Sequence, residues 1–469
     1  MDRRVRSEER AFDQAAFDQV RKATAELASL IANGPIVPTV TPEEVRSYLT
    51  SRYDFTKPLG LDDVIADVEQ MLRKWQVHVT HPRYFGLFNP SVTVASVVAD
   101  LLVAMYNPQL ATWRTSPAAN EIERHTLIWL AGKFGLPRCT VSHFTSGGGE
   151  SNFSAVVVAL AHAFPDFGEG GLRQLAASPV IYLTGGAHHG FLKIARMAGL
   201  GRGALRTVAM DGNLKMDLVD LAQKVTEDRK SGLAPLMVVG TAGTTAAGVI
   251  DPLSDLARFC RTEDLWFHVD AAWGGAAVIS PRLSSHLAGI GDADSITCDA
   301  HKWFSVPMGA GMFFCRHPGA VLSAFDSEVA FMPGKTPAIL DPYTSTVQWS
   351  RRFIGLKLFL TLAERGESGY AEMIEHQARM GDVLRRSLER AGWRIVNSTP
   401  LPLVCFTRDG LVAAKFLAEL YKRQIAGMSE FEREGIGPVL RACVTSCRTT
   451  EQDIEGVVGE MSRIPHGAE

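Results

Sequence analysis

The sequence contains no long apolar run and little excess charge of either sign. No stretch of about 18 successive apolar residues occurs, so we expect no membrane span. The first ten residues, MDRRVRSEER, lack the apolar segment of a signal peptide. With 48 Lys and Arg against 51 Asp and Glu, the formal net charge is −3, too small to recruit nucleic acid or an anionic membrane. We therefore expect a cytoplasmic protein that binds neither.

Cysteine is also scarce, and its arrangement excludes two classes of small scaffold. The chain has seven cysteines, an odd number, widely scattered and without a CxxC pair. This pattern is not that of a disulfide framework or a zinc ribbon, and it suits a reducing compartment. Cys443 and Cys447 are four residues apart, but no nearby histidine makes them a metal pair. We predict no metal site.

What the sequence does contain is an alternation of helical and strand-like stretches between residues 125 and 320. Such an alternation predicts an α/β fold with a mainly parallel sheet that has helices on both faces. The strand-like runs are Val141–Ser146, Pro179–Gly186, Leu205–Met210, Pro235–Gly243, Leu265–Asp270, Ser295–Asp299 and Gly311–Cys315.

Helical segments precede this region, and a smaller α/β pattern follows it. Residues 1–32 carry apolar side chains at helical spacing, and Thr41 followed by Pro42 is a good helix start. From about residue 366 onward, a long helical stretch leads into short strands. We divide the chain into an N-terminal helical segment (1–105), a large domain (106–350) and a small C-terminal domain (351–469).

Three chemically distinct side chains are predicted at the carboxyl ends of strands in the large domain. Lys302 follows the strand that ends in Asp299, Asp270 ends another, and His188 follows a third. Open α/β sheets bind ligands at this edge. An amine, a carboxylate and a flat ring suit pyridoxal phosphate: the lysine forms an imine with its aldehyde, the acid holds the ring nitrogen protonated, and the imidazole stacks on the ring.

A glycine-rich turn offers a place for the phosphate. The run TSGGGESN, residues 145–152, precedes an apolar helical stretch. Glycine lets a phosphate approach the backbone, and a helix N-terminus supplies free N–H groups and a positive dipole. We select Gly148 and Gly149, with Ser146 and Ser151 as further candidates.

Taken together, these motifs resemble the group II pyridoxal-phosphate-dependent amino acid decarboxylases, the family of aromatic amino acid and glutamate decarboxylases. The matching runs, in family order, are HPRYFGLFNP, TWRTSPAANEIER, TSGGGESN, AHHGFLKIARMAGLG, HVDAAWGG, DAHKW and SRRFIGLKLF. The resemblance implies the fold-type I architecture of aspartate aminotransferase and a homodimer in which the N-terminal helices pack on the partner subunit.

The resemblance also implies further cofactor residues. Ala272 would let the ring lie flat, His301 would sit at the phosphate end, and Thr244 would lie beside the cofactor or the substrate. Two positions depart from the family pattern. Gly190 stands where a serine often follows the stacking histidine, and Asp299 places an acid near the phosphate, so we do not assign Asp299 as a phosphate ligand.

For the substrate, the resemblance implies a pocket built by two chains. Phe88, with Leu87 beside it, would line the side-chain pocket. Gln109 and Ala111 would come from the second subunit, where aromatic-specific members carry bulky apolar residues, so a smaller or more polar substrate side chain is compatible. Arg441 would bind the α-carboxylate, although an edge-strand surface arginine is an equally good interpretation.

The predicted function is decarboxylation of an L-amino acid to the amine and CO₂. The resemblance places Phe331 where decarboxylating members carry a proton-donating tyrosine. Tyr343 in the same segment and His188 are the alternative proton donors. A phenylalanine there favours the alternative of an aldehyde synthase, which couples decarboxylation to oxidative deamination. A carbon–carbon lyase of the sphingosine-phosphate lyase kind and a non-catalytic cofactor-binding scaffold are the remaining alternatives.

Overall fold

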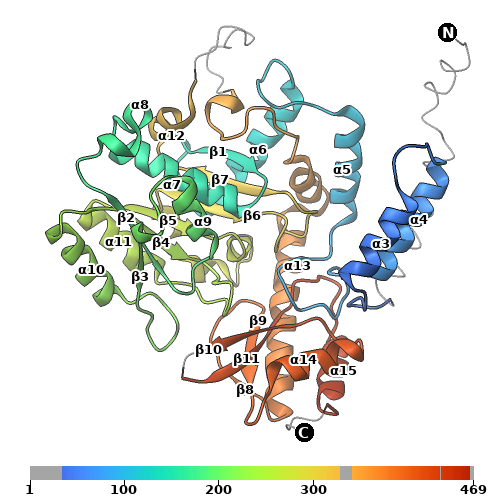
Figure 1. Cartoon of the computed structure of the whole chain (residues 1–469). Coiled ribbons are helices and arrows are strands. Elements are labelled where there is room, and N and C mark those ends of the chain that lie inside the picture. The colour runs from blue at the N-terminus through green and yellow to red at the C-terminus, as the bar shows by residue number, and fades with distance from the viewer. Residues whose placement is uncertain (1–33, 328–340, 434, 465–469) are drawn as a thin grey trace, which may run out of the picture.

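The computed structural model describes residues 34–327, 341–433 and 435–464 (Figure 1). The helix predicted over residues 1–32 and the candidate Phe331 lie outside these ranges. The described chain forms a large α/β unit around one sheet, a smaller α/β unit at the C-terminal end, and a pair of N-terminal helices beside them (Figure 1).

A seven-stranded sheet forms the centre of the large unit, in the order β1-β7-β6-β5-β4-β2-β3. Strands β6, β5, β4, β2 and β3 pair in parallel, and β7 is antiparallel to both β1 and β6. The strands are β1 (Val141–Thr145), β2 (Pro179–Thr184), β3 (Leu205–Val208), β4 (Ala234–Thr241), β5 (Trp266–Asp270), β6 (Ser295–Asp299) and β7 (Gly311–Cys315). The predicted mainly parallel sheet and fold-type I architecture are confirmed.

Helices cover both faces of this sheet and bury it. Helix α7 packs against β4, β5, β6 and β7, with Val156, Ala159 and Leu160 fully buried. The other face packs a larger apolar cluster around Trp303 and Phe314. The helices of the large unit are α6 (Pro117–Phe134), α7 (Gly148–Ala163), α8 (Phe167–Gly170), α9 (Gly190–Met197), α10 (Leu218–Lys230), α11 (Leu253–Glu263) and α12 (Pro318–Phe325).

The C-terminal unit has its own antiparallel sheet and apolar core. Its strand order is β10-β11-β9-β8, with β8 (Arg394–Ile395), β9 (Leu403–Thr407), β10 (Ser429–Arg433) and β11 (Gly437–Cys443). Helices α14 (Ala413–Lys422) and α15 (Glu451–Met461) accompany it. The long α13 (Leu356–Arg390) joins the two units and is interrupted at Gly366, whose φ of 66° suits glycine. The domain boundaries at 105 and 350 stay a prediction.

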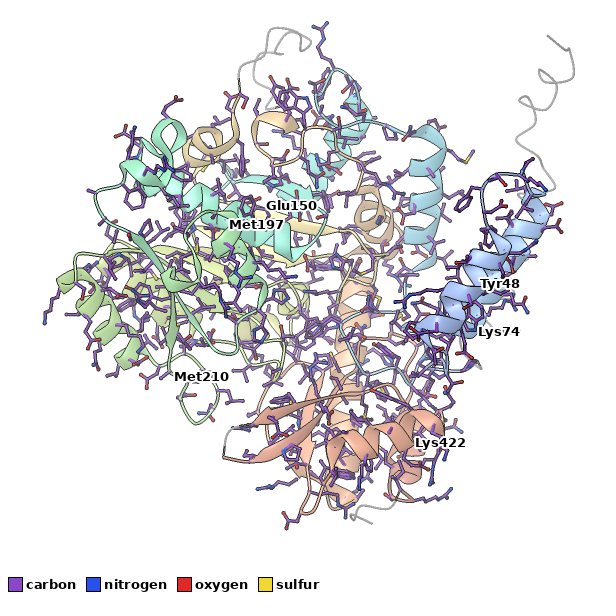
Figure 2. All side chains as sticks on the ribbon, in the orientation of Figure 1. Tyr48, Lys74, Glu150, Met197, Met210 and Lys422 are labelled. Carbon is purple, nitrogen blue, oxygen red and sulfur yellow. The ribbon has the colours of Figure 1, made fainter. Side chains whose placement is uncertain are left out.

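The N-terminal helices lie at the edge of the molecule. Helix α3 (Pro42–Arg52) begins after Thr41, as the sequence predicts, and Thr41 and Glu44 form a capping box there. Neither α3 nor α4 (Leu61–Trp75) buries a residue, and Figure 2 shows Tyr48 and Lys74 on this outlying pair. Helix α5 (Val94–Tyr106) packs against α13. None of the helices in the described ranges combines the length and apolar character needed to cross a bilayer.

Candidate active site

A cavity of about 290 Å³ opens at the edge of the large sheet where its parallel strands end. Its walls come from the segments that follow β1, β2, β4, β5 and β6, together with Phe88 from the loop before α5. Four larger depressions, of about 660, 580, 560 and 310 Å³, contain Gln109 alone among the predicted site residues. The smaller cavity is therefore the candidate site, because amine, carboxylate and imidazole groups converge there.

Lys302 enters the cavity beside a carboxylate. Its Nζ lies 3.0 Å from Oδ2 of Asp299 and 5.7 Å from the ring centroid of Phe88. Burial acts to lower the pKa of Lys302, but Asp299 and Asp270 outweigh it and the pKa is raised. The acid that the sequence left unexplained is thus paired with the lysine, and it also lines the cavity.

Asp270 ends β5, lines the same cavity and is held by two donors. Its Oδ2 accepts a hydrogen bond of 2.9 Å from Nδ2 of Asn152, and its Oδ1 accepts one of 3.1 Å from the Ala272 amide. Only 5% of Asp270 is exposed. A carboxylate fixed in this way can accept a hydrogen bond from a protonated ring nitrogen.

The glycine-rich turn brings the N-terminus of α7 to the cavity. A Cβ on Gly148 would lie 2.9 Å from Asp299 Oδ2 and 3.3 Å from the Cβ of Ala272, so the turn needs glycine there. The first N–H groups of a helix have no intrahelical acceptor. Gly147, Gly148, Gly149 and Ser146 all line the cavity, and an anion fits beside them.

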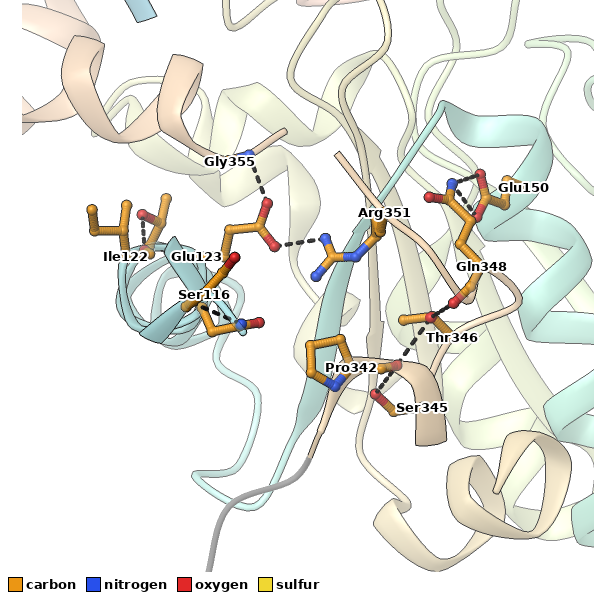
Figure 3. A network of polar contacts seen from close by, with 12 residues as sticks. Ser116, Ile122, Glu123, Glu150, Pro342, Ser345, Thr346, Gln348, Arg351 and Gly355 are labelled. Atoms are coloured by element: carbon orange, nitrogen blue, oxygen red, sulfur yellow. Dashed lines mark hydrogen bonds and ion pairs between the residues drawn. The ribbon is translucent and has the colours of Figure 1, made fainter. Parts of the chain in front are cut away.

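Two side chains of this turn are engaged elsewhere. Ser146 donates its hydroxyl to Glu150, which also accepts from Gln348 (Figure 3). Ser151 is fully buried, lies 2.7 Å from the Thr145 hydroxyl and does not line the cavity. The backbone of the turn, rather than the Ser151 hydroxyl, therefore faces the cavity.

His301 lies at the same end of the cavity as the turn. Its Nδ1 accepts a hydrogen bond of 3.1 Å from the Ala310 amide, so the proton of the neutral ring is on Nε2. Burial, more than any neighbouring charge, lowers the pKa of His301. A neutral imidazole with an Nε2–H donor is suited to an anionic oxygen.

His188 follows β2 and is oriented by the backbone of Gly190. The Gly190 amide donates to His188 Nδ1 at 3.1 Å, which leaves the proton of the neutral ring on Nε2. A Cβ at position 190 would lie 2.6 Å from Nδ1, so a serine there would collide with the ring in this orientation. The Gly190 amide thus gives His188 a hydrogen-bond donor, although position 190 lacks the serine hydroxyl that the resemblance leads us to expect.

Phe88 is the one predicted substrate residue that lines the cavity. Its ring stacks on Trp273 at 4.7 Å, and the Arg441 guanidinium lies 4.7 Å from its centroid. Arg441 is buried, donates to the carbonyls of Thr245 and Gly86, and lies behind the cavity lining. The neighbouring Leu87 is 56% exposed and does not line the cavity.

Other predicted residues lie away from this cavity. Gln109 donates to Ser350, and the Tyr343 amide donates to the Ala111 carbonyl. Tyr343 is buried in a short 3₁₀ turn and packs on Trp349. None of Gln109, Ala111 and Tyr343 lines the cavity that holds their own chain's Lys302.

Several cavity residues were not selected from the sequence. Asn152 follows Gly148 by one helical turn and shares its face, a spacing that could have revealed it. Thr241 and Thr245 line the cavity, whereas the predicted Thr244 is buried and accepts from the Val249 amide. The Thr241 hydroxyl is buried and has no partner among the described residues. Trp273 and Met308 complete the walls.

This set of groups fits pyridoxal phosphate. Lys302 offers an amine to the aldehyde, Asp270 a carboxylate to the ring nitrogen, and Ala272 a small surface for the ring. The turn at α7, which a Cβ at Gly148 would fill, offers space and N–H groups to the phosphate. Amine, carboxylate and anion site share one cavity.

Comparison with known proteins agrees with this chemistry. The family model described as "Pyridoxal-dependent decarboxylase conserved domain" matches residues 42–408. The aromatic-L-amino-acid decarboxylase of Bacillus atrophaeus is 27% identical over 392 residues, 80% of each chain. The 4-hydroxyphenylacetaldehyde synthase of Rhodiola rosea is 28% identical over 383 residues, 79% of this chain and 76% of the relative.

Solved structures share the fold along nearly the whole chain. The crystal structure of mouse CSAD has a TM-score of 0.88 at 23% identity and covers 96% of this chain and 98% of its own. The Oryza sativa TDC structure with PLP and tryptamine also has a TM-score of 0.88, at 23% identity, covering 96% and 99%. The chain therefore belongs to the pyridoxal-dependent decarboxylase family, with pyridoxal phosphate as its cofactor and decarboxylation as its reaction.

Proposed function

We propose that the protein removes the α-carboxylate of an L-amino acid and releases CO₂ and the amine. The observation that carries this proposal is the placement of Lys302, Asp270 and the α7 turn around a single cavity. Relatives named as amino acid decarboxylases, including those of Bacillus atrophaeus and Narcissus pseudonarcissus, support it.

The side chains of this cavity have separate roles in the proposal. Lys302 would hold the cofactor covalently, and Asp270 would accept a hydrogen bond from its ring nitrogen. The α7 turn and the Nε2–H of His301 would bind the phosphate, and the His188 imidazole would stack on the ring. When bound, the cofactor supplies the electron sink for the pair left on Cα. Ala272 and Phe88 keep the remaining surface apolar and exclude water.

The attachment at Lys302 is tested by Lys302→Ala. The wild-type protein should absorb at about 420 nm, as lysine-bound pyridoxal phosphate does, and should carry the cofactor on Lys302 after borohydride reduction. The variant should lose both the band and the modified peptide. Lys224→Ala on α10 is the matched control and should keep both. A modified peptide that persists in Lys302→Ala would show a different attachment site.

The reaction itself is tested with a panel of the twenty amino acids. CO₂, amine, aldehyde and peroxide should be measured separately for each. The proposal expects CO₂ and amine in equal amounts from at least one amino acid, without peroxide. Protein that carries the cofactor on Lys302 and yet releases no CO₂ from any of them would overturn the proposal.

A second candidate function is aldehyde synthesis, favoured by Phe331 at the position where the resemblance expects a tyrosine. A relative named as a phenylacetaldehyde synthase, from Arabidopsis thaliana, is 26% identical over 394 residues. Such a reaction would consume O₂ and water and would yield CO₂, aldehyde, ammonia and hydrogen peroxide. If it operates, Phe331→Tyr should shift product from aldehyde towards amine, and an unchanged product ratio would remove Phe331 from this interpretation.

We propose further that the protein is a homodimer. Helices α3 and α4 bury no residue, and α5 exposes Val94, Leu101, Met105 and Tyr106 at 74, 44, 52 and 82%. Large contiguous apolar patches of this kind mark protein interfaces. A second copy of the chain is the occupant that the sequence resemblance implies. Gln109 and Ala111, which lie away from their own chain's cavity, would then contribute to the partner's.

The dimer is tested by the molar mass in solution. Light scattering after gel filtration should give twice the mass of the 51.0 kDa chain. Leu101→Glu should shift the protein towards the monomer, because it places a charge in the apolar face of α5. Val219→Glu, at a 78% exposed position on α10, is the control and should leave the mass unchanged. A wild-type protein with the mass of one chain would refute the dimer. The cytoplasmic location stays a prediction.

A further inference from the structure

Behind Asp270 runs an unbroken chain of buried polar groups that the reaction itself does not require. Asn152 Nδ2 lies 2.9 Å from Asp270 Oδ2, and its Oδ1 lies 2.9 Å from His268 Nε2. His268 Nδ1 lies 2.8 Å from Ser295 Oγ, which lies 2.8 Å from Trp266 Nε1. Asn152, His268 and Ser295 are 1, 0 and 0% exposed.

Elementary donor and acceptor rules fix the direction of every bond in this chain. An ionised Asp270 can only accept, so Asn152 must present its NH₂ to Asp270 and its carbonyl oxygen to His268. His268 must therefore carry a proton on Nε2. At the other end, the indole N–H of Trp266 can only donate, so Ser295 accepts from it and gives its own proton to His268 Nδ1.

The protonation state of His268 agrees with this assignment. Burial lowers the pKa of His268 to about 4, against the opposing effect of the Asp270 charge, so the ring is neutral at neutral pH. A neutral imidazole has one donor and one acceptor, which is what the chain requires. All four hydrogen bonds are satisfied, and each proton points towards Asp270.

We propose that His268 and Ser295 are positioning residues that act through Asn152 to keep Asp270 ionised and aimed at the ring nitrogen of the cofactor. Burial alone favours the neutral form of a carboxyl group, and donated hydrogen bonds favour the anion. Without His268, the Asn152 amide is free to turn its oxygen towards Asp270 and repel it. With these hydrogen bonds intact, the proton shared by Asp270 and the cofactor would stay on the ring nitrogen. The inference rests on the proposed role of Asp270.

The test compares cofactor binding in the wild type and four variants. His268→Phe removes the Nε2–H donor, whereas His268→Gln keeps an N–H at nearly the same place. Thr297→Val is the matched control, because the Thr297 hydroxyl is buried on the same strand, two residues from Ser295, and has no partner among the described residues. The readouts are the dissociation constant of the cofactor and the ¹⁵N NMR shift of a cofactor labelled at the ring nitrogen.

The wild type, His268→Gln and Thr297→Val should show a protonated ring nitrogen and similar affinities. His268→Phe should show an unprotonated nitrogen and an affinity weaker by about tenfold, the size of one hydrogen bond to a charged group. Ser295→Ala, a smaller change, should act in the same direction, and it decides the question if His268→Phe does not fold.

The outcomes separate this inference from the proposed function. A wild-type protein that does not bind the cofactor on Lys302 would refute the proposed function. A wild type that binds it with a protonated ring, together with the same ring state and affinity in His268→Phe or Ser295→Ala, would overturn only the positioning role.

Discussion

At the scale of single residues, the proton on Lys302 is controlled by two carboxylates. Asp299 lies 3.0 Å from its Nζ, and Asp270, which lines the same cavity, adds a second negative charge. Their charges raise the pKa of Lys302 against the opposing effect of burial. Because only the neutral amine attacks an aldehyde, Asp299 sets the pH range in which the cofactor is captured.

Asp299→Asn should therefore move cofactor capture to lower pH. Without the Asp299 carboxylate, the effect of burial on Lys302 is opposed by one charge fewer, so the pKa of Lys302 should fall. The measurement is the rate at which the visible band forms when cofactor-free protein is mixed with pyridoxal phosphate between pH 6 and 10. Asp228→Asn, at a buried carboxylate that pairs with Arg206 outside the cavity, should leave the midpoint unchanged. An unshifted midpoint in Asp299→Asn would contradict the argument.

Gly190 controls the orientation of His188 in a way that a substitution can expose. Gly190→Ala would place a Cβ 2.6 Å from His188 Nδ1, so the ring must rotate away from the Gly190 amide. We expect kcat to fall at least tenfold while the Lys302 absorption band remains, because the attachment site is untouched. Gly203→Ala, where a Cβ meets no atom within 4 Å, is the control. Unchanged kcat in Gly190→Ala would show that this orientation does not matter.

Some of these residues could be predicted from the sequence and others could not. Lys302, Asp270 and His188 each follow an apolar run, and the ends of parallel strands meet at one edge of a sheet. Asn152 lies on α7 one helical turn after Gly148, so its spacing from the glycine-rich turn could have indicated it. His268 carries no signal of its own, because it lies inside the apolar run that forms β5 and its partners come from α7 and β6.

At the scale of elements, a buried ion pair connects α6 to the segment that begins α13. Glu123 accepts from Arg351 Nη1 at 2.6 Å and from the Gly355 amide at 2.9 Å (Figure 3). The two side chains are 4% and 3% exposed. Since both ions are shielded from water, removing one leaves the other without compensation.

Glu123→Gln should destabilise the protein by about 3 kcal/mol or more, because the Arg351 charge then lies buried and unpaired. The double replacement Glu123→Leu with Arg351→Met should cost less than the two single changes added together. Denaturant unfolding of each variant measures these differences. Arg352→Gln, at an exposed ion pair with Asp100, is the control and should cost no more than about 1 kcal/mol. A small effect of Glu123→Gln would mean that water reaches the pair.

The strands differ in how well the sequence predicts them. The five inner strands of the large sheet, β7, β6, β5, β4 and β2, are largely buried, so they stand out as nearly continuous apolar runs, whereas the edge strands β1 and β3 are only partly buried. Strand β10 reads SEFER and alternates between half-buried and exposed residues at the edge of the small sheet. With three charged residues of five, its sequence is typical of a loop. It is a strand because it pairs with β11, and that pairing forms only in the tertiary fold.

At the scale of the whole molecule, two buried histidines link stability to pH. Burial lowers the pKa of His143 to about 3 and that of His268 to about 4, from 6.5. The unfolded chain therefore binds more protons than the folded chain below pH 6.5, and stability is lost as the pH falls. Burial raises the pKa of Asp251 to about 6, so this acid changes the stability in the opposite direction as the pH falls. The two histidines outweigh the single acid.

The free energy of unfolding should thus fall by roughly 3 kcal/mol between pH 7 and pH 5. His143→Leu should flatten this slope, because neither nitrogen of His143 has a partner among the described residues and the leucine has no proton to gain. Urea unfolding at several pH values measures the slope. A variant as pH-sensitive as the wild type would exclude His143 as a source.

The residues of the cavity lie at the carboxyl ends of the parallel strands or on segments that pack against those ends. The opposite rim of the sheet can therefore be changed without touching the cavity. The turn between α10 and β4 lies on that rim. The eight residues of β4 separate this turn from Thr241, which lines the cavity, by about 25 Å. At its centre, Gly232 has a φ of 76° and no atom within 4 Å of a Cβ position. A peptide tag or a small reporter domain inserted after Gly232 should leave catalysis intact, and this turn is where the enzyme can be fused to other modules.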